Sequence, residues 1–201
     1  MRLEILPNSI EVKQLIEKDS RFEQIVQNVG PITLHLDKNY VHALISAIIA
    51  QQLSGKVAQV IERRVYDFFE QDITTKKILD EDEQNLRNLG LSFPKIKYLK
   101  SLALCIDSRL VTFERIDEKS DQEIIDMLVQ VKGIGVWTAQ MFLIFAMGKM
   151  DVFSSLDLGL RNGVKKLYRN ENLTKDEIEV ISQQWTPHRT IASLYLWRFI
   201  D

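Results

Sequence analysis

Apolar side chains recur along this chain at intervals of three and four residues. The clearest run extends from Tyr40 to Gln52, where the apolar positions that mark one side are Leu44, Ile45, Ile48 and Ile49. This spacing places apolar side chains on one face of a helix, whereas a half-buried strand alternates with a period of two. The same spacing recurs along most of the chain. We therefore predict an all-α protein.

Capping and turn residues mark the ends of the predicted helices. Ser120 and Thr174 each precede a glutamate by three positions, which is the capping-box signature of a helix N-terminus. Gly30-Pro31 closes an N-terminal pair of helices, and the segment from there to Lys38 is predicted to be a connector. The predicted helices cover residues 8–18, 20–28, 40–52, 56–69, 74–79, 82–88, 94–104, 120–130 and 188–200, and the pattern is again helical between 164 and 185.

Composition limits the class of protein. The chain has 201 residues, of which 45% are hydrophobic and 27% charged, and this suits one large domain or two small ones with an apolar core. The single cysteine, Cys105, lies in the apolar run 102–106 and is predicted to be a buried structural thiol. One cysteine can form neither a disulfide within the chain nor a cysteine-ligated zinc or iron–sulfur site.

Net charge and the lack of targeting signals limit which partners and which location we expect for this protein. The net charge of −2 and a pI near 6.0 argue against a polycation that coats nucleic acid. Backbone amides at helix N-termini nevertheless bind phosphates without basic side chains. The N-terminus lacks the apolar core of a signal peptide, and no apolar run is long enough to span a bilayer. We therefore expect a cytoplasmic protein with no membrane partner.

The segment from Leu128 to Ala139 contains the most informative motif. A predicted helix ends there, Gly133 and Gly135 flank Ile134, and an apolar helix begins at once. Glycine tolerates positive φ and close approach by another backbone, so this turn can point N–H groups outward at the start of a helix. One interpretation is therefore a phosphate-binding turn. The other is a hairpin whose glycines only reverse the chain.

A second candidate lies about twenty residues downstream. Asp157 begins a predicted helix, so one interpretation is an N-cap that accepts hydrogen bonds from the amides of Gly159 or Leu160. The other is catalytic, because an aspartate at a helix N-terminus stays ionised near neutral pH and can stabilise positive charge that develops on a sugar. Both interpretations stay open. Asp151 is the weaker candidate for the same role.

The hairpin and Asp157 together resemble the helix-hairpin-helix (HhH-GPD) family of DNA glycosylases, in the DNA-3-methyladenine glycosylase II branch. The motif positions that match are Leu128, Gly133, Gly135, Thr138 and Ala139, followed by Asp157. Residues 43–58 resemble the first long helix of that branch and residues 86–102 its next segment, so the resemblance extends from about Tyr40 to the end. The chain has no room for the N-terminal β domain of larger relatives and resembles the compact form.

The resemblance implies both a fold and a reaction. We expect an HhH-GPD glycosylase fold of two helical lobes with a cleft between them: residues 36–148 with the hairpin at 131–138, and residues 1–35 with 149–201. The implied enzyme is a monofunctional glycosylase that hydrolyses the N-glycosidic bond of alkylated purines, such as 3-methyladenine and 7-methylpurines, in base excision repair. It flips the base out of the duplex, and Asp157 stabilises an oxocarbenium-like transition state.

One position distinguishes branches of the family. Members that also cut the strand have a lysine two residues after the second hairpin glycine, where it attacks the sugar as an amine. This chain has Trp137 at that position, so no lyase activity is expected. The chain also cannot form the four-cysteine cluster of other branches.

The resemblance assigns further residues to the site. An alkylated purine is cationic, and aromatic faces attract cations. The candidate pocket residues are Trp137, for which a core tryptophan is the alternative, with Tyr40, Met141, Trp185 and His188. The candidate DNA contacts are the wedge residues Gln52 and Leu53, the phosphate-binding residues Ser54 and Lys56, and the hairpin residues Gly133, Ile134, Gly135 and Thr138. A core position is the alternative for Leu53.

The remaining expectations concern cofactors and partners. No cofactor and no iron–sulfur cluster are required, and the carbonyls of Val129, Val131 and Gly133 are candidates to hold a structural Na⁺ or K⁺. The expected partner is double-stranded DNA with damaged bases, bound by a monomer in the cytoplasm and associated with the nucleoid. Two alternatives stay open: a glycosylase for uracil, hypoxanthine or an oxidised purine, and a non-enzymatic HhH DNA-binding module. In the module, Asp157 is only a cap.

Overall fold

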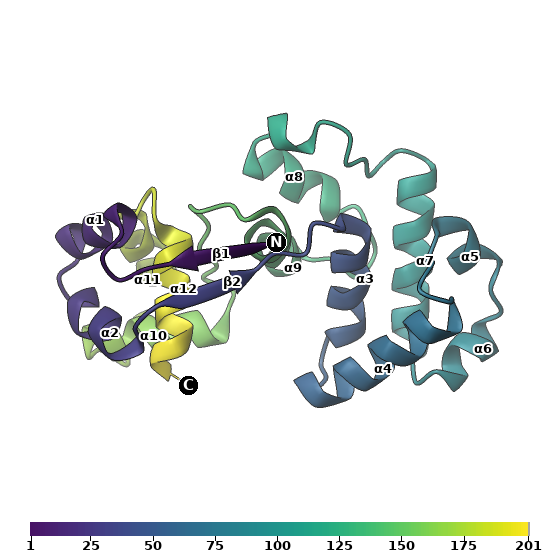
Figure 1. The fold of residues 1–201 in the computed structure, drawn as a ribbon, viewed down its shortest axis with the longest axis horizontal. Helices are drawn as coiled ribbons and strands as arrows, with labels where there is room; N and C mark the ends of the chain where they lie inside the picture. The colour runs from purple at the N-terminus through teal and green to yellow at the C-terminus, as the bar shows by residue number, and fades with distance from the viewer. Residues whose placement is uncertain (201) are drawn as a thin grey trace. The chain divides into compact units, whose positions relative to one another are not determined.

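The computed structural model describes residues 1–200, which form two compact units (Figure 1). The terminal unit contains Met1–Lys38 and the chain from Gln140 onward, and the central unit contains Asn39–Ala139. Helix α9 (Val136–Phe142) runs from the central into the terminal unit. None of the helices within residues 1–200 has the length and hydropathy needed to cross a membrane.

The central unit is helical. Its elements, in chain order, are α3 (Tyr40–Ala50), α4 (Gly55–Phe68), α5 (Thr75–Asp80), α6 (Glu83–Asn88), α7 (Phe93–Asp107), the 3₁₀ turn η1 (Ile116–Glu118) and α8 (Asp121–Leu128). The side chain of the N-cap residue bonds to the first turn of most of these helices, as Ser120 does in the predicted capping box. Helix α7 packs against α3, α5 and α6 and buries Ile96, Leu99 and Leu102.

The terminal unit combines helices with a small sheet. Its elements are β1 (Arg2–Ile5), α1 (Ile10–Lys18), α2 (Phe22–Val29), β2 (Ile32–His35), the π-helical turn η2 (Leu143–Met147), α10 (Leu158–Tyr168), α11 (Lys175–Gln183) and α12 (Arg189–Ile200). The two strands pair antiparallel, with Arg2 opposite His35 and Ile5 opposite Ile32. Helix α12 packs against α1, α2 and α10, so it is the central helix of this unit.

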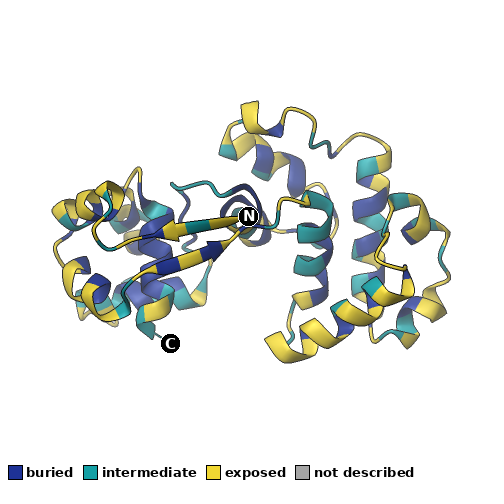
Figure 2. Cartoon of the chain, viewed as in Figure 1, coloured by how far each residue is buried: buried dark blue, intermediate teal, exposed yellow. Residues whose placement is uncertain are grey.

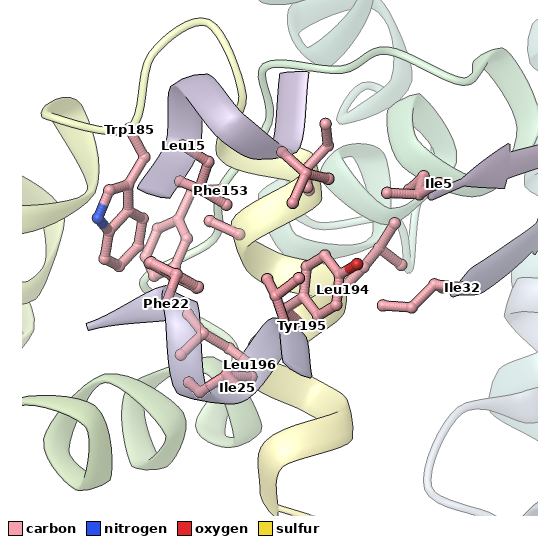
Figure 3. Close-up of a cluster of buried hydrophobic side chains, with 14 of the residues drawn as sticks. Ile5, Leu15, Phe22, Ile25, Ile32, Phe153, Trp185, Leu194, Tyr195 and Leu196 are labelled. Carbon is pink, nitrogen blue, oxygen red and sulfur yellow. The ribbon is translucent and has the colours of Figure 1, made fainter. Parts of the chain in front are cut away.

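The core of the terminal unit gathers residues from both ends of the chain. Figure 3 shows Trp185 beside Phe22 of α2 and Phe153, with Tyr195 of α12 in the same apolar cluster. The ring of Phe22 meets Trp185 edge-on with centroids 5.3 Å apart. Because the N-terminal helices pack on the C-terminal ones, this unit forms only when distant segments meet.

The prediction of an all-α fold is confirmed except for the two-stranded sheet, which the sequence analysis missed. The segment predicted as a connector contains β2, whose side chains alternate between buried and exposed (Figure 2). Four residues give too short a pattern to distinguish a strand from a loop, and its partner β1 lies about thirty residues away.

The units also divide at a different place from the predicted lobes. We expected residues 140–148 in the central lobe, whereas their contacts place them in the terminal unit. The amide of Asp37 donates to the carbonyl of Phe145 at 3.0 Å, and the ammonium of Lys38 donates to the carbonyl of Met147 at 2.9 Å. These bonds tie η2 to the segment that follows β2.

Candidate functional site

The hairpin between α8 and α9 is built around Gly133. Its φ of +92° is a conformation that side chains with a Cβ rarely adopt. A Cβ at this position would lie 2.3 Å from the ring of Tyr98 on α7. Gly133 is therefore required both by the backbone conformation and by the close packing of the hairpin on α7.

Gly135 has different surroundings from Gly133. A Cβ added to Gly135 would meet no described atom within 4 Å. Gly135 is exposed and directly precedes α9. The side chains of the neighbouring Ile134 and Thr138 are buried, so they pack in the interior of the hairpin. The amide of Ile134 donates to the carbonyl of Val131 at 3.0 Å. Of the predicted hairpin contacts, Gly135 is the one whose surface is open.

The turn between α3 and α4 is held by two side chains that the sequence analysis did not single out for this role. The side-chain amide Nε2 of Gln51 donates to the carbonyl of Gly133 at 2.8 Å, and the ammonium of Lys95 donates to the carbonyl of Ile49 at 2.7 Å. Burial lowers the pKa of Lys95. Because its ammonium binds the last turn of α3, Lys95 serves as a cap there.

The predicted wedge and phosphate-binding residues lie on this turn. Gln52 is exposed with a φ of +57°, and Leu53 is half-buried. Ser54 occupies the N-cap position of α4 without a capping bond from its side chain, and both Ser54 and Lys56 are exposed. The turn therefore presents polar groups on both sides of one apolar residue.

Asp157 caps helix α10, as one of its two interpretations requires. Its Oδ1 accepts a hydrogen bond from the amide of Leu160 at 2.8 Å. The same oxygen accepts a bond from the indole Nε1 of Trp197 at 3.0 Å. The carboxylate is half-buried. Capping does not exclude catalysis, because a capping carboxylate at a helix N-terminus is also a fixed negative charge.

Asp151, the weaker candidate, is committed to an ion pair. The Nε of Arg189 lies 2.8 Å from its Oδ1, and the Nη2 of Arg189 lies 3.1 Å from its Oδ2. The backbone amide of Arg189 also donates to Oδ1. This carboxylate is neutralised by a guanidinium that anchors the start of α12, so its charge is less suited to stabilise a substrate cation.

Two of the proposed pocket residues lie inside the terminal unit. Trp185 is fully buried against Phe22 and Phe153 (Figure 3). Its Nε1 donates to Oδ2 of the buried Asp19 at 3.1 Å. The structure thus places Trp185 in the core instead of on a pocket wall. His188 is buried as well, its Nε2 lies 2.8 Å from Oε1 of Gln14, and burial lowers its pKa.

The other aromatic candidates are accessible. Trp137 is 41% exposed on α9, which does not fit the alternative of a core tryptophan. Tyr40 is half-buried at the start of α3 beside Phe113, with ring centroids 5.6 Å apart, and burial raises its pKa. Met141 is half-buried on α9.

Comparison with known proteins decides the family. The model of the HhH-GPD superfamily of base excision DNA repair proteins matches residues 45–188, which include the hairpin and Asp157. The chain belongs to the HhH-GPD superfamily. The hairpin between α8 and α9, with Gly133 and Gly135, lies within the residues that the HhH-GPD model matches.

The relatives of this HhH-GPD chain cover nearly all of it. DNA-3-methyladenine glycosylase 1 of Schizosaccharomyces pombe is 36% identical over 94% of this chain and 85% of its own, and a DNA-3-methyladenine glycosylase of Saccharomyces cerevisiae is 31% identical over 92% and 77%.

Solved structures are similarly close. A DNA-3-methyladenine glycosidase from Bacillus halodurans superposes with a TM-score of 0.88 at 32% identity, over 98% of this chain and 91% of that one. The S. pombe 3-methyladenine DNA glycosylase in complex with abasic DNA superposes with a TM-score of 0.83 at 33% identity, over 94% and 96%.

Proposed function

We propose that this HhH-GPD protein is a monofunctional DNA glycosylase that removes alkylated purines, 3-methyladenine above all, in base excision repair. The observation that carries the proposal is the carboxylate of Asp157, held at the N-terminus of α10 about twenty residues after the hairpin. The names of relatives that match more than 90% of the chain support the substrate class.

The chemistry needs little more than a placed negative charge. The bond between C1′ of the sugar and the base nitrogen breaks with its electron pair leaving on the base, and a water oxygen then bonds to C1′ and loses its proton. The sugar becomes oxocarbenium-like on the way, and Asp157 stabilises that charge and orients or deprotonates the water. An alkylated purine leaves as a neutral base from a cationic nucleotide, so a strong general acid is less necessary.

Exposed residues of the central unit are suited to hold damaged DNA. The backbone of Gly135 presents an open surface at a helix start, where a phosphate can approach closely. We assign Gln52 and Leu53 to fill the gap that a flipped base leaves, and the exposed Ser54 and Lys56 to contact phosphates. We assign double-stranded DNA as the partner. A monomer of the protein binds this DNA in the nucleoid.

Base selection falls mainly to aromatic side chains. The partly exposed Trp137 supplies an aromatic ring that can attract a cationic purine, and Tyr40 and Met141 are further pocket candidates. A tryptophan cannot act as the amine nucleophile that strand cleavage needs, so the product is an intact abasic site.

No organic cofactor takes part in this scheme. The hairpin carbonyls suit a structural Na⁺ or K⁺ in kind, since oxygen donors bind hard cations. The candidate carbonyls are those of Val129, Val131 and Gly133. The carbonyl of Val131 already accepts a hydrogen bond from the amide of Ile134, and that of Gly133 accepts one from the side chain of Gln51. Each of these two carbonyl oxygens keeps a second lone pair. Within residues 1–200, acidic, histidine and cysteine side chains form no group of three that could hold a metal ion.

The deciding experiment is release of bases from a duplex methylated with radiolabelled methyl groups. We expect the native protein to release 3-methyladenine and 7-methylguanine without nicking the strand, and Asp157→Asn to release neither. Asp82→Asn is the matched control, because Asp82 caps α6 through a 2.7 Å bond from Gln84 and asparagine caps a helix as well as aspartate. It should keep full activity.

The same base-release assay, run on duplexes with other lesions, separates the alternative functions. Release of uracil, hypoxanthine or an oxidised purine in place of alkylated bases, from duplexes that contain those lesions, would show a glycosylase of another specificity. Binding of DNA with release of no base would show a DNA-binding module. Full activity of Asp157→Asn would refute the assigned carboxylate.

A further inference from the structure

Trp197 connects the last helix of the chain to the carboxylate of Asp157. It lies on α12, forty positions after Asp157, and its indole Nε1 donates to Oδ1 of that residue at 3.0 Å. Its ring lies beside Phe145 of η2, with centroids 5.8 Å apart and planes 30° from parallel. The indole is therefore held on one edge by the carboxylate and on one face by Phe145.

Two donors from different elements meet at the same carboxylate oxygen. The amide of Leu160 belongs to the first turn of α10 itself, whereas the indole belongs to α12. A cap bond alone leaves the carboxylate some freedom to rotate about its last side-chain torsion. Because the backbone fixes Cβ and the two donors fix Oδ1, the second oxygen, Oδ2, is confined to a small region.

The first turn of α10 is shaped around this contact. A Cβ at Gly159 would lie 3.1 Å from Oδ1 of Asp157 and 3.2 Å from Cδ1 of Trp197. Both distances are tighter than ordinary van der Waals contact, so a larger residue would press on the carboxylate and the indole together. Gly159 leaves the space in which the two side chains meet.

We propose that Trp197 is a positioning residue that aims the Asp157 carboxylate in the glycosylase reaction. The proposal rests on the proposed function, in which Asp157 is the catalytic carboxylate. A carboxylate stabilises a transition state best when its position and orientation are fixed before the reaction. Small displacements of a reacting group lower rates strongly. Trp197 sets the direction of the Asp157 carboxylate through its indole hydrogen bond.

Kinetics test the proposal through a matched pair of variants on α12. Trp197→Phe keeps a large aromatic ring but removes the donor, and we expect the single-turnover rate of 3-methyladenine release to fall about tenfold. The dissociation constant for abasic DNA should stay unchanged. Tyr195→Phe is the control: it removes a donor that bonds to the carbonyl of Gly30 at 3.1 Å, and its rate should equal that of the native protein.

Rates of Trp197→Phe equal to the native rate would overturn the proposal. So would a fall in rate that Tyr195→Phe reproduces, because it would reflect general loosening of α12. Gly159→Ala gives a second variant that keeps every donor and acceptor, and we expect it also to lower the single-turnover rate while DNA binding is retained.

Nuclear magnetic resonance tests the hydrogen bond without activity. In the ¹⁵N-labelled native chain, the indole signals of Trp137, Trp185 and Trp197 are assigned from Trp→Phe variants. Asp157→Asn replaces the charged acceptor by an amide, and we expect it to shift the Trp197 indole proton well beyond the other two. Asp82→Asn should shift none of them. An unmoved Trp197 signal in Asp157→Asn would refute the contact.

These measurements also separate the two levels of the argument. If Asp157→Asn is fully active, the catalytic assignment of Asp157 fails, whatever Trp197 does. If Asp157→Asn is inactive and Trp197→Phe has the native rate, only the positioning role fails.

Discussion

The side-chain amide of Gln51 donates a 2.8 Å hydrogen bond to the carbonyl of Gly133, so the turn between α3 and α4 is tied directly to the hairpin. Both ends of this bond belong to segments that we assign to DNA contact: Gln52 and Leu53 follow Gln51, and Gly135 follows Gly133. One neutral hydrogen bond thus joins the turn between α3 and α4 to the hairpin.

Removal of this bond should weaken DNA binding more than it affects folding. For Gln51→Ala we expect a loss of about 1 kcal/mol in the free energy of unfolding, measured by denaturant titration. The dissociation constant for abasic duplex, measured by fluorescence anisotropy, should rise several-fold because the two turns lose their fixed spacing. Gln59→Ala, an exposed position on α4, is the control. Unchanged DNA affinity in Gln51→Ala would show that the two turns act independently.

The two hairpin glycines should respond differently to alanine. Gly133→Ala forces a Cβ to within 2.3 Å of Tyr98 at a φ of +92°, so the melting temperature should fall sharply. Gly135→Ala meets no described atom within 4 Å, and the melting temperature should stay the same or rise slightly. If a phosphate lies against Gly135, however, the added methyl group should lower DNA affinity. Native affinity in a stably folded Gly135→Ala would count against that contact.

Asp19 should be essential for stability and irrelevant to chemistry. Its fully buried carboxylate accepts hydrogen bonds from Tyr168 at 2.8 Å and from Trp185 at 3.1 Å. Burial and this carboxylate raise the pKa of Tyr168 to about 12. Asp19→Ala leaves the donors of Tyr168 and Trp185, together with the amide and guanidinium of Arg21, without their acceptor and should cost about 3 kcal/mol in the free energy of unfolding. Below its unfolding transition, the variant should release bases at the native rate. A cost under about 1 kcal/mol would contradict this role.

His188 should make the protein sensitive to mild acid. Burial lowers its pKa below the ordinary value of 6.5, so near and below pH 6.5 the unfolded chain binds more protons than the folded one. Stability is therefore complete above 6.5 and falls as the pH drops toward the lowered value in the folded state. His188→Gln should make the free energy of unfolding less dependent on pH in this window, measured by denaturant titration at a series of pH values. An identical pH dependence in the variant would assign the effect to other groups.

The local features of this protein were readable from the chain, because they depend on neighbours within a few residues. Ser120 and Thr174 form the predicted capping boxes, and Asp157 caps α10 through Leu160. The hairpin glycines and the helical fold class also followed from short patterns. In the capping contacts the interacting groups lie within one helical turn, so spacing alone determines the geometry.

Contacts between distant segments were decided only by the tertiary structure. The sequence ranked Asp151 below Asp157 but could not show that Arg189 pairs with Asp151 while Trp197 donates to Asp157. Trp185 was a pocket candidate until packing with Phe22 buried it. The chain alone determined which groups could cap, turn or bind. Which of them meet depends on apolar packing that brings α12 against the N-terminal helices, because that burial, and not the pattern of any one segment, fixes distances between residues far apart in sequence.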